Sequence, residues 1–243
     1  MASFLESSLQ RDIDRIRTNV TEMGRLAAGA LKDCLQAVSA HDRELAYAVI
    51  LRDQYVDDKE KEIDRLCLEF LVRQQPVAQP LRFAYTTIRI NLELERVGDY
   101  AESIARQLLK VREMPATFPQ ERFGELARSS IAMLEDAIKS FVTQDADLAR
   151  KTIELEDAID LRKSALIKEL AHLFREGKVP FEALDPLTIM VRRYERVADQ
   201  ARNICTEVLY MCTGEYVKHQ GSEVFRVLFV DEHVLIVDKP AGM

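Results

Sequence analysis

The sequence predicts an all-α protein made of two tandem three-helix bundles, with six long helices and a short C-terminal β-like tail. Apolar residues recur every three or four positions over long stretches, which is the spacing of amphipathic helices. Eight Gly and seven Pro, 15 of 243 residues, specify few turns. The first half of the chain is also repeated in the second half, which indicates a duplicated structural unit.

Apolar spacing and helix-breaking segments define three helices in the first repeat. The first helix is predicted to end at about residue 39, and the second begins near Asp42, a residue type that favours the N-cap. The prolines of QQPVAQP (74–80) end the second helix. The third helix carries a seam of apolar residues, predicted to be buried, at Phe83, Thr87, Ile90, Leu94, Val97, Ala101, Ile104, Leu108 and Val111.

A shift of 103 residues places DRELAYAVILRDQYVD (42–57) on DADLARKTIELEDAID (145–160), and a shift of 100 places ERVGD (95–99) on ERVAD (195–199). The seam of the second repeat is then Ala183, Leu187, Met190, Tyr194, Val197, Ala201, Ile204, Val208 and Met211. We therefore divide the chain into a first repeat (1–113), a linker (114–120), a second repeat (121–220) and a tail (221–243).

The charge balance argues against nucleic-acid binding and favours cations or basic partners. The chain has 34 Lys and Arg against 41 Asp and Glu, which gives a net charge of −7. No apolar stretch is long enough for a membrane span, and the charged N-terminus is unlike a secretory signal. Four cysteines without CxxC spacing are typical of reduced thiols. These features predict a cytoplasmic protein.

Acidic pairs with four-residue spacing fall at matching positions of the two repeats. They are Asp53 with Asp57 and Glu156 with Asp160 on the second helices, and Glu95 with Asp99 and Glu195 with Asp199 on the third helices. Residues four apart share a helix face, so each pair carries a repulsion of a few tenths of a kcal/mol. Glu95 and Asp99 lie nearly opposite the apolar seam, so we expect them to face outward.

Either basic side chains or a bound cation could offset this repulsion. Arginines within reach allow ordinary salt bridges; they are Arg96 in the first repeat and Arg192, Arg196 and Arg202 in the second. A metal site made of carboxylate oxygens would select hard ions such as magnesium, calcium, manganese or iron. Zinc is less favoured without imidazole or thiolate ligands.

We find no arrangement of catalytic residues. The four histidines are not at helical spacing from the acidic pairs, so the Glu-x-x-His ligation of di-iron bundles is missing. Ser-His-Asp, Cys-His and Gly-rich phosphate-loop arrangements are missing as well. We therefore expect neither enzyme activity nor an organic cofactor. Two alternatives remain open: a metal-dependent carboxylate-bundle enzyme that uses the same acids, and a plain helical scaffold protein.

The motifs ERVGDYAESIA (95–105) and ERVADQARNICTEVL (195–209), with the opening RIRTNVTEMGRLA (15–27), resemble the PhoU family over residues 9 to about 219. The resemblance implies a cytoplasmic, usually dimeric negative regulator of phosphate uptake and phosphate-starvation signalling. It implies partnership with the ATPase subunit of the phosphate ABC transporter and with a phosphate-sensing histidine kinase. Contact with the membrane would occur only through these partners, and no nucleic acid is expected.

The resemblance also implies divalent or trivalent metal ions, such as iron, manganese, magnesium or zinc, on the outer bundle surface. Matched position by position, the metal residues would be Glu95, Asp99, Glu195, Asp199, Asp53, Asp57, Glu156 and Asp160. The two repeats differ from each other near these motifs: Ser103 stands where the second repeat has Asn203, and Ala198 stands where the first has Gly98. We therefore expect the two sites to bind metal unequally.

The composition changes in the tail, where VFRVLFVDEHVLIVDKPAGM (224–243) predicts a β-hairpin. Residues 227–243 are similar to the two strands that open the catalytic domain of RluA-type pseudouridine synthases. The catalytic Asp of that family has no match in these residues. We therefore assign no uridine chemistry to the chain.

Overall fold

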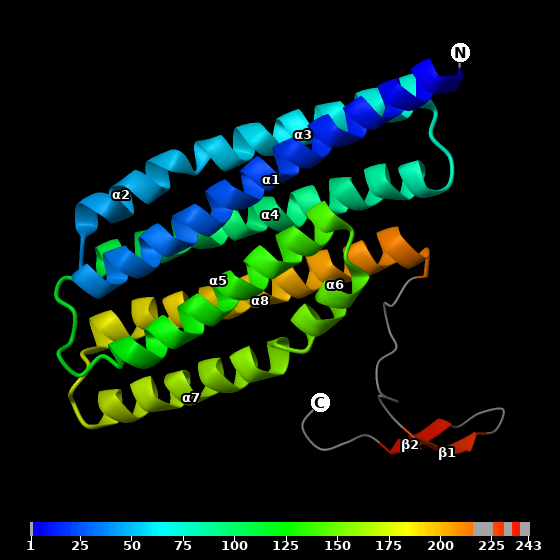
Figure 1. Ribbon diagram of the computed structural model, residues 1–243. Coiled ribbons are helices and arrows are strands. Elements are labelled where there is room, and N and C mark those ends of the chain that lie inside the picture. The colour runs from blue at the N-terminus through cyan, green and yellow to red at the C-terminus, as the bar shows by residue number, and fades with distance from the viewer. Residues whose placement is uncertain (1, 216–225, 231–234, 239–243) are drawn as a thin grey trace.

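The computed structural model describes residues 2–215, 226–230 and 235–238 (Figure 1). Within these residues the chain forms helices followed by two short strands. The helices are α1 (Ala2–Ala40), α2 (Arg43–Arg52), α3 (Gln54–Gln74), α4 (Gln79–Lys110), α5 (Gln120–Thr143), α6 (Ala146–Ile153), α7 (Glu156–Arg175) and α8 (Phe181–Thr213). The all-α fold class predicted from the sequence is confirmed.

Two of the six predicted long helices contain a local break, at Asp53 in the first repeat and at Glu154 and Leu155 in the second, where the backbone angles stay in the helical region. Asp42 does cap α2 by accepting a hydrogen bond from the backbone N–H of Leu45 at 2.9 Å. The helix then breaks at Asp53 and restarts as α3. At this break the chain lies directly against Gly98 of α4, a tertiary contact that apolar periodicity cannot reveal. The second repeat has a matching break between α6 and α7.

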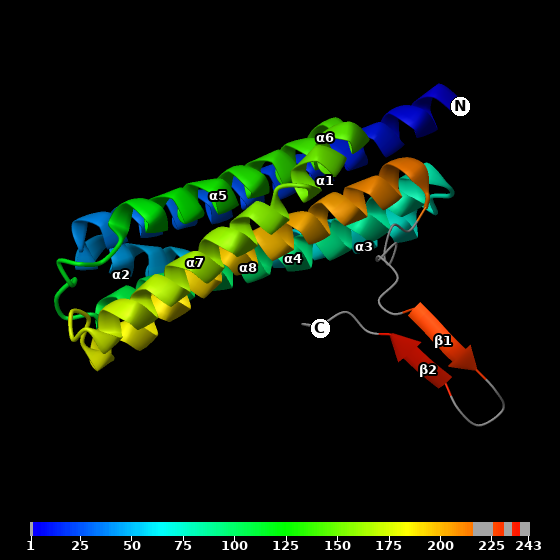
Figure 2. The ribbon, with the colours of Figure 1, turned by 90° about the horizontal axis from the view of Figure 1, so that it is seen from below.

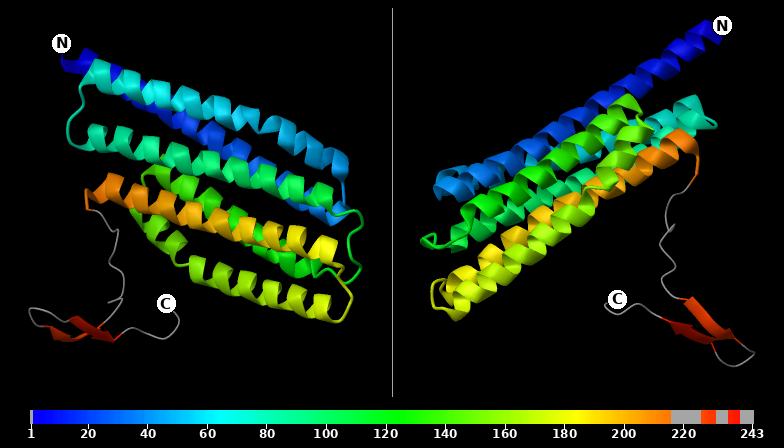
Figure 3. Two further views of the ribbon diagram at one scale, coloured as in Figure 1. Left: turned by 180° about the vertical axis from the view of Figure 1, so that it is seen from behind. Right: turned by 60° about the horizontal axis from the view of Figure 1, so that its bottom comes forward.

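The helices form two layers. Seen from behind, α3, α4, α8 and α7 lie side by side in that order, and α1 and α5 pack behind them (Figure 3). The edge-on view shows α1 and α5 together on one side of this row (Figure 2). The two central helices, α4 and α8, share the most extensive helix–helix contact, which joins the two repeats. The outer face of the four-helix row is therefore a continuous surface to which both repeats contribute.

The apolar seams predicted for the third helix of each repeat form the core. All nine seam residues of the first repeat and all nine of the second are buried. Phe83 stacks on Phe141 with ring centroids 5.9 Å apart, which ties the first repeat to α5 of the second. Tyr194 is fully buried, and its hydroxyl donates a hydrogen bond to the carbonyl oxygen of Leu31 at 2.9 Å. These contacts hold α4 and α8 in fixed rotation about their axes, so their outer faces are also fixed.

In the tail, β1 (Arg226–Val230) pairs antiparallel with β2 (Leu235–Asp238). The register runs from Arg226 opposite Asp238 to Val230 opposite Leu235, with an irregularity between Val227 and Phe229. The other parts of the predicted tail, including the turn between the strands, lie outside the described residues. No helix in the described part of the chain combines the length and the apolar character that a membrane crossing needs.

Candidate metal-binding surface

The four predicted acids of the first repeat lie on one surface where α3 meets α4. Asp53 is at the break before α3, and Asp57 follows one turn later. Asp53 lies against α4, because a Cβ placed on Gly98 would be only 3.1 Å from its Oδ1 atom. Asp99 is exposed and Glu95 is partly buried on the facing side of α4. The outward direction predicted for Glu95 and Asp99 is therefore correct, with α3 covering part of Glu95.

Two further carboxylates, Glu60 of α3 and Glu102 of α4, extend this surface. They lie close enough to change the pKa of the predicted acids. We define the first acidic cluster as Asp53, Asp57, Glu60, Glu95, Asp99 and Glu102. Arg106 pairs with Glu102 at 2.5 Å. Within the described residues, the other five acids form no ion pair or side-chain hydrogen bond.

The electrostatics of the first acidic cluster penalise its negative charge. Burial, and next the charge of Asp57, raise the pKa of Asp53 to about 6. Glu102 and Asp99 act on Asp53 in the same direction. Burial and then neighbouring acids also raise the pKa values of Glu60, Glu95 and Asp99. A cation at this surface would relieve both the repulsion and the raised pKa values.

The donor set of the first cluster fits a hard metal ion by its chemistry. It consists of carboxylate oxygens and carries excess negative charge, and among the described residues Arg106 is its single paired basic partner. In the residues that the structure describes, no three His, Cys, Asp or Glu side chains converge on a point that could hold a metal. Binding would therefore require the carboxylates to rotate toward one another. These side chains are partly exposed, which leaves them room to rotate.

The four acids of the second repeat, defined here as the second acidic cluster, lie on the corresponding surface of α7 and α8. They are Glu156, Asp160, Glu195 and Asp199, and each has a basic partner. Lys163 Nζ lies 3.4 Å from Asp160 Oδ1 and 3.0 Å from Glu195 Oε1. Although burial lowers the pKa of Lys163, its contacts with these acids raise it above its usual value.

Two arginines complete the pairing in the second cluster. Arg202 Nε lies 3.1 Å from Glu156 Oε1, and Arg196 Nη1 lies 3.0 Å from Asp199 Oδ2. Four acids thus face three cations, so the donor set does not fit a metal ion without displacing those cations. In the second repeat, ordinary salt bridges therefore offset the repulsion between the acids, which is one of the two possibilities that the sequence left open. Ser103 and Asn203 form hydrogen bonds between α4 and α8. Ser103 accepts one from Arg193, and Asn203 donates one to Glu93.

Sequence reasoning missed three residues that distinguish the two clusters: Glu60, Glu102 and Lys163. A usable signal was present in the repeat alignment. The shift of 103 that pairs Asp57 with Asp160 also pairs Glu60 with Lys163. The shift of 100 pairs Glu102 with Arg202. Both positions reverse charge between the repeats, which only a charge-by-charge comparison of the two halves would reveal.

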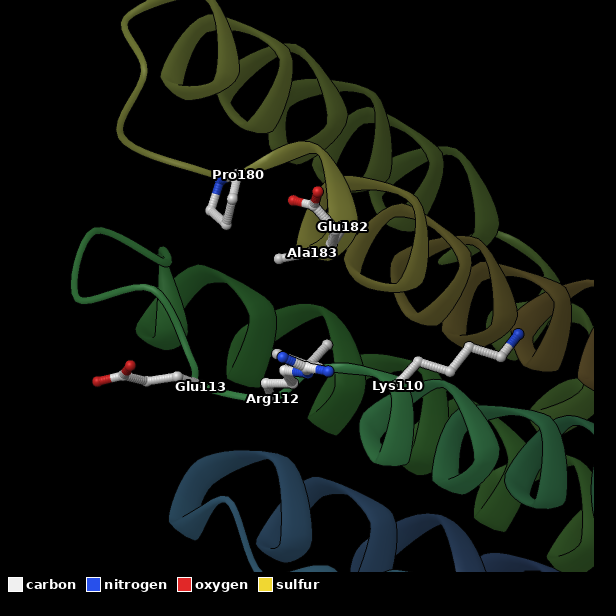
Figure 4. Close-up of a pocket in the computed structure, with 7 residues that line it drawn as sticks. Lys110, Arg112, Glu113, Pro180, Glu182 and Ala183 are labelled. Carbon is white, nitrogen blue, oxygen red and sulfur yellow. The ribbon is translucent and has the colours of Figure 1, made fainter.

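A hollow of about 590 Å³ lies away from both clusters, between the end of α4 and the start of α8 (Figure 4). Its lining consists of Lys110, Val111, Arg112, Glu113, Pro180, Glu182 and Ala183. None of the motif carboxylates lines it. This hollow therefore does not provide the enclosed pocket that the enzyme alternative would need around those acids.

The fold and the surface together define a class: an all-α protein with two helical repeats that display acidic residues at matched positions. The chain belongs to the PhoU family, because the PhoU domain model matches residues 20–108 and 123–208. Both matched segments end before the tail, so the similarity of residues 227–243 to RluA-type enzymes stays a prediction.

Similar proteins agree with this assignment. A phosphate-specific transport system accessory protein PhoU homolog of Aquifex aeolicus is 32% identical, over 87% of this chain and 96% of that protein. The phosphate-specific transport system accessory protein PhoU homolog 1 of Thermotoga maritima is 28% identical, over 86% of this chain and 90% of that protein. The crystal structure of PhoU from Pseudomonas aeruginosa superposes with a TM-score of 0.81 at 26% identity, covering 85% of this chain and 99% of that chain.

Proposed function

We propose that this protein is a cytoplasmic negative regulator of phosphate uptake and of phosphate-starvation signalling. The observation that carries the proposal is that both repeats match the PhoU domain. Relatives that align over almost their whole length are named accessory proteins of the phosphate-specific transport system. An accessory protein acts by binding other components, which agrees with a fold that presents a broad surface of four helices.

Its partners would be the ATPase subunit of a phosphate ABC transporter and a phosphate-sensing histidine kinase. The protein would act as a homodimer and reach the membrane only through these partners. The net charge of −7 favours protein partners with basic surfaces over nucleic acid. We propose no catalytic role, because the hollow between α4 and α8 is lined by none of the motif carboxylates.

Metal binding is the second part of the proposal. Asp53, Asp57, Glu95 and Asp99 would hold a divalent or trivalent ion, with Glu60 and Glu102 at the edge of the site. Iron, manganese and magnesium suit carboxylate oxygens better than zinc does. The ion would neutralise the crowded charge and hold α3 against α4. Metal binding would thereby stabilise one arrangement of the surface on which a partner docks.

The regulatory role is tested by deleting the protein in its host and measuring a phosphate-responsive reporter at high and low phosphate. We expect the reporter to stay active at high phosphate in the deletion strain. Re-expression of the wild type should restore repression. A reporter that responds to phosphate equally well with and without the protein would contradict the proposal.

The role of the first cluster is tested separately by capture of the ATPase subunit. The variant Glu95→Gln/Asp99→Asn should capture less of it than the wild type does. The matched control is Glu195→Gln/Asp199→Asn, which makes the same chemical change in the second repeat. Equal losses in both variants would show that docking does not depend on the first cluster in particular.

A further inference from the structure

The two repeats differ in charge at the edges of their acidic clusters. Glu60 of the first repeat corresponds to Lys163 of the second, and Glu102 corresponds to Arg202. Each replacement changes the local charge by two units. The four motif acids have an acidic counterpart at every position, so the repeats differ at the edges and not at the motif itself.

The reversed residues connect the two helices that carry the second cluster. Lys163 extends from α7 and reaches Glu195 of α8 at 3.0 Å while also contacting Asp160. Arg202 extends from α8 and reaches Glu156 of α7 at 3.1 Å. The ammonium and guanidinium groups thus connect acids from two helices, as a metal ion would have to do.

Burial makes the pair between Lys163 and Glu195 more persistent than ordinary surface pairs. The side chain of Glu195 is only 13% exposed and that of Lys163 is 23% exposed. Charges removed this far from water attract each other more strongly and are screened less by salt. The surface beside Glu195 is basic as well. The described residues that line a groove of about 420 Å³ there include four basic side chains and one acid, namely Lys163, Lys168, Arg192, Arg196 and Glu195.

We infer that the second acidic cluster is closed to metal by Lys163 and Arg202, so that the chain has one metal site and not two. The inference rests on the proposed function for the first site. The lysine and arginine would act as permanent internal countercharges, which stabilise the second repeat whether or not metal is available. Only the first repeat would then respond to the metal supply.

The inference is tested by counting metal ions bound to the full chain. Purified protein is stripped with chelator and equilibrated with Mn²⁺, and the bound manganese is measured by elemental analysis and titration calorimetry. Glu195→Gln/Asp199→Asn should bind as much manganese as the wild type. Glu95→Gln/Asp99→Asn should lose essentially all of it. Loss of about half the bound manganese in the second-repeat variant would overturn the inference.

A variant that gains manganese in the second repeat tests the inference in the opposite direction. Lys163→Glu/Arg202→Glu restores the charges of the first repeat and should about double the bound manganese. This gain should disappear when Glu195→Gln/Asp199→Asn is added. The control is Lys139→Glu/Arg175→Glu, which makes the same change in net charge at exposed positions that form no ion pair within the described residues. If Lys163→Glu/Arg202→Glu does not fold, the milder variant Lys163→Gln/Arg202→Gln takes its place.

The outcomes separate this inference from the proposed function. If the wild type binds no manganese but the charge-reversed variant does, the closure of the second cluster by Lys163 and Arg202 stands, whereas the metal role of the first cluster, and with it the count of one site, is wrong. If the charge-reversed variant or its Gln version folds and gains no manganese, Lys163 and Arg202 are not what closes the second cluster, and the inference is wrong.

Discussion

The two repeats carry matched acids on matched helices, yet the electrostatic environment of these acids differs between the two surfaces. In the first repeat, carboxylates crowd together and burial raises the pKa of Asp53 to about 6. In the second, Lys163 and Arg202 pair with the acids from across the α7–α8 contact. A duplicated motif therefore does not by itself imply a duplicated site. Under our proposal, the residues one turn away decide whether the carboxylates are free to bind a cation.

The largest expected difference between the repeats is in their response to metal. Mn²⁺ at about one hundred times its Kd should stabilise the wild type by roughly 2.7 kcal/mol, since a ligand that binds only the folded state shifts the unfolding equilibrium. This corresponds to an increase in Tm of about 5–10 °C for a domain of this size. Differential scanning calorimetry with and without chelator measures it.

The same measurement on two variants assigns the effect to one repeat. Glu95→Gln/Asp99→Asn should abolish the increase in Tm, whereas Glu195→Gln/Asp199→Asn should retain it. An equal reduction in both variants would mean that the two surfaces bind metal alike. The two repeats would then not differ in their response to metal.

Removal of one charge at a corresponding position should have opposite effects in the two repeats. Lys163→Ala leaves Glu195 and Asp160 without their shared partner and should destabilise the metal-free protein by about 1–2 kcal/mol, between the values for surface and buried pairs. Glu60→Ala removes a repelling charge and should be neutral or stabilising by a few tenths of a kcal/mol. Urea unfolding in the presence of chelator gives both values.

Much of this arrangement follows from the sequence, and the remainder depends on tertiary contacts. The seam from Phe83 to Val111 is buried as predicted, because helical periodicity alone decides which face packs. The capping role of Asp42 was likewise local and therefore predictable. The break at Asp53 lies against Gly98, a residue distant in sequence, so local periodicity does not predict it. The pairing of Lys163 could not be predicted from local spacing, because its partner Glu195 lies on another helix.

Charge crowding in the first repeat should also produce a characteristic pH dependence. The folded-state pKa of Asp53 is about 6 and its reference value is 3.8, so between these values the folded state binds more protons than the unfolded state. Ionisation of Asp53 therefore destabilises the metal-free fold as pH rises through this window. Asp53→Asn should be more stable than the wild type by about 1 kcal/mol above pH 6, after allowance for solvent screening.

This advantage of Asp53→Asn should shrink as the pH falls from 6 toward 3.8, where the wild-type side chain becomes protonated. The matched control is Glu156→Gln in the second repeat. Burial raises the pKa of Glu156 as well, but the charge of Arg202 opposes the shift, so the effect should be smaller. Urea unfolding of both variants at pH 5 and pH 7.5 distinguishes them. A pH-independent difference would show that Asp53 is not under electrostatic strain.

The smallest expected effect on stability concerns Gly98, which corresponds to Ala198 in the second repeat. Gly98→Ala gains about 0.5–1 kcal/mol of helix propensity, but its Cβ would lie 3.0 Å from Val56 Cγ1 and 3.1 Å from Asp53 Oδ1. These contacts force small shifts, so the net change in stability should stay within about 0.5 kcal/mol. Because the alanine at 98 displaces Asp53, Gly98→Ala should weaken Mn²⁺ binding although the fold is intact, which calorimetric titration would detect.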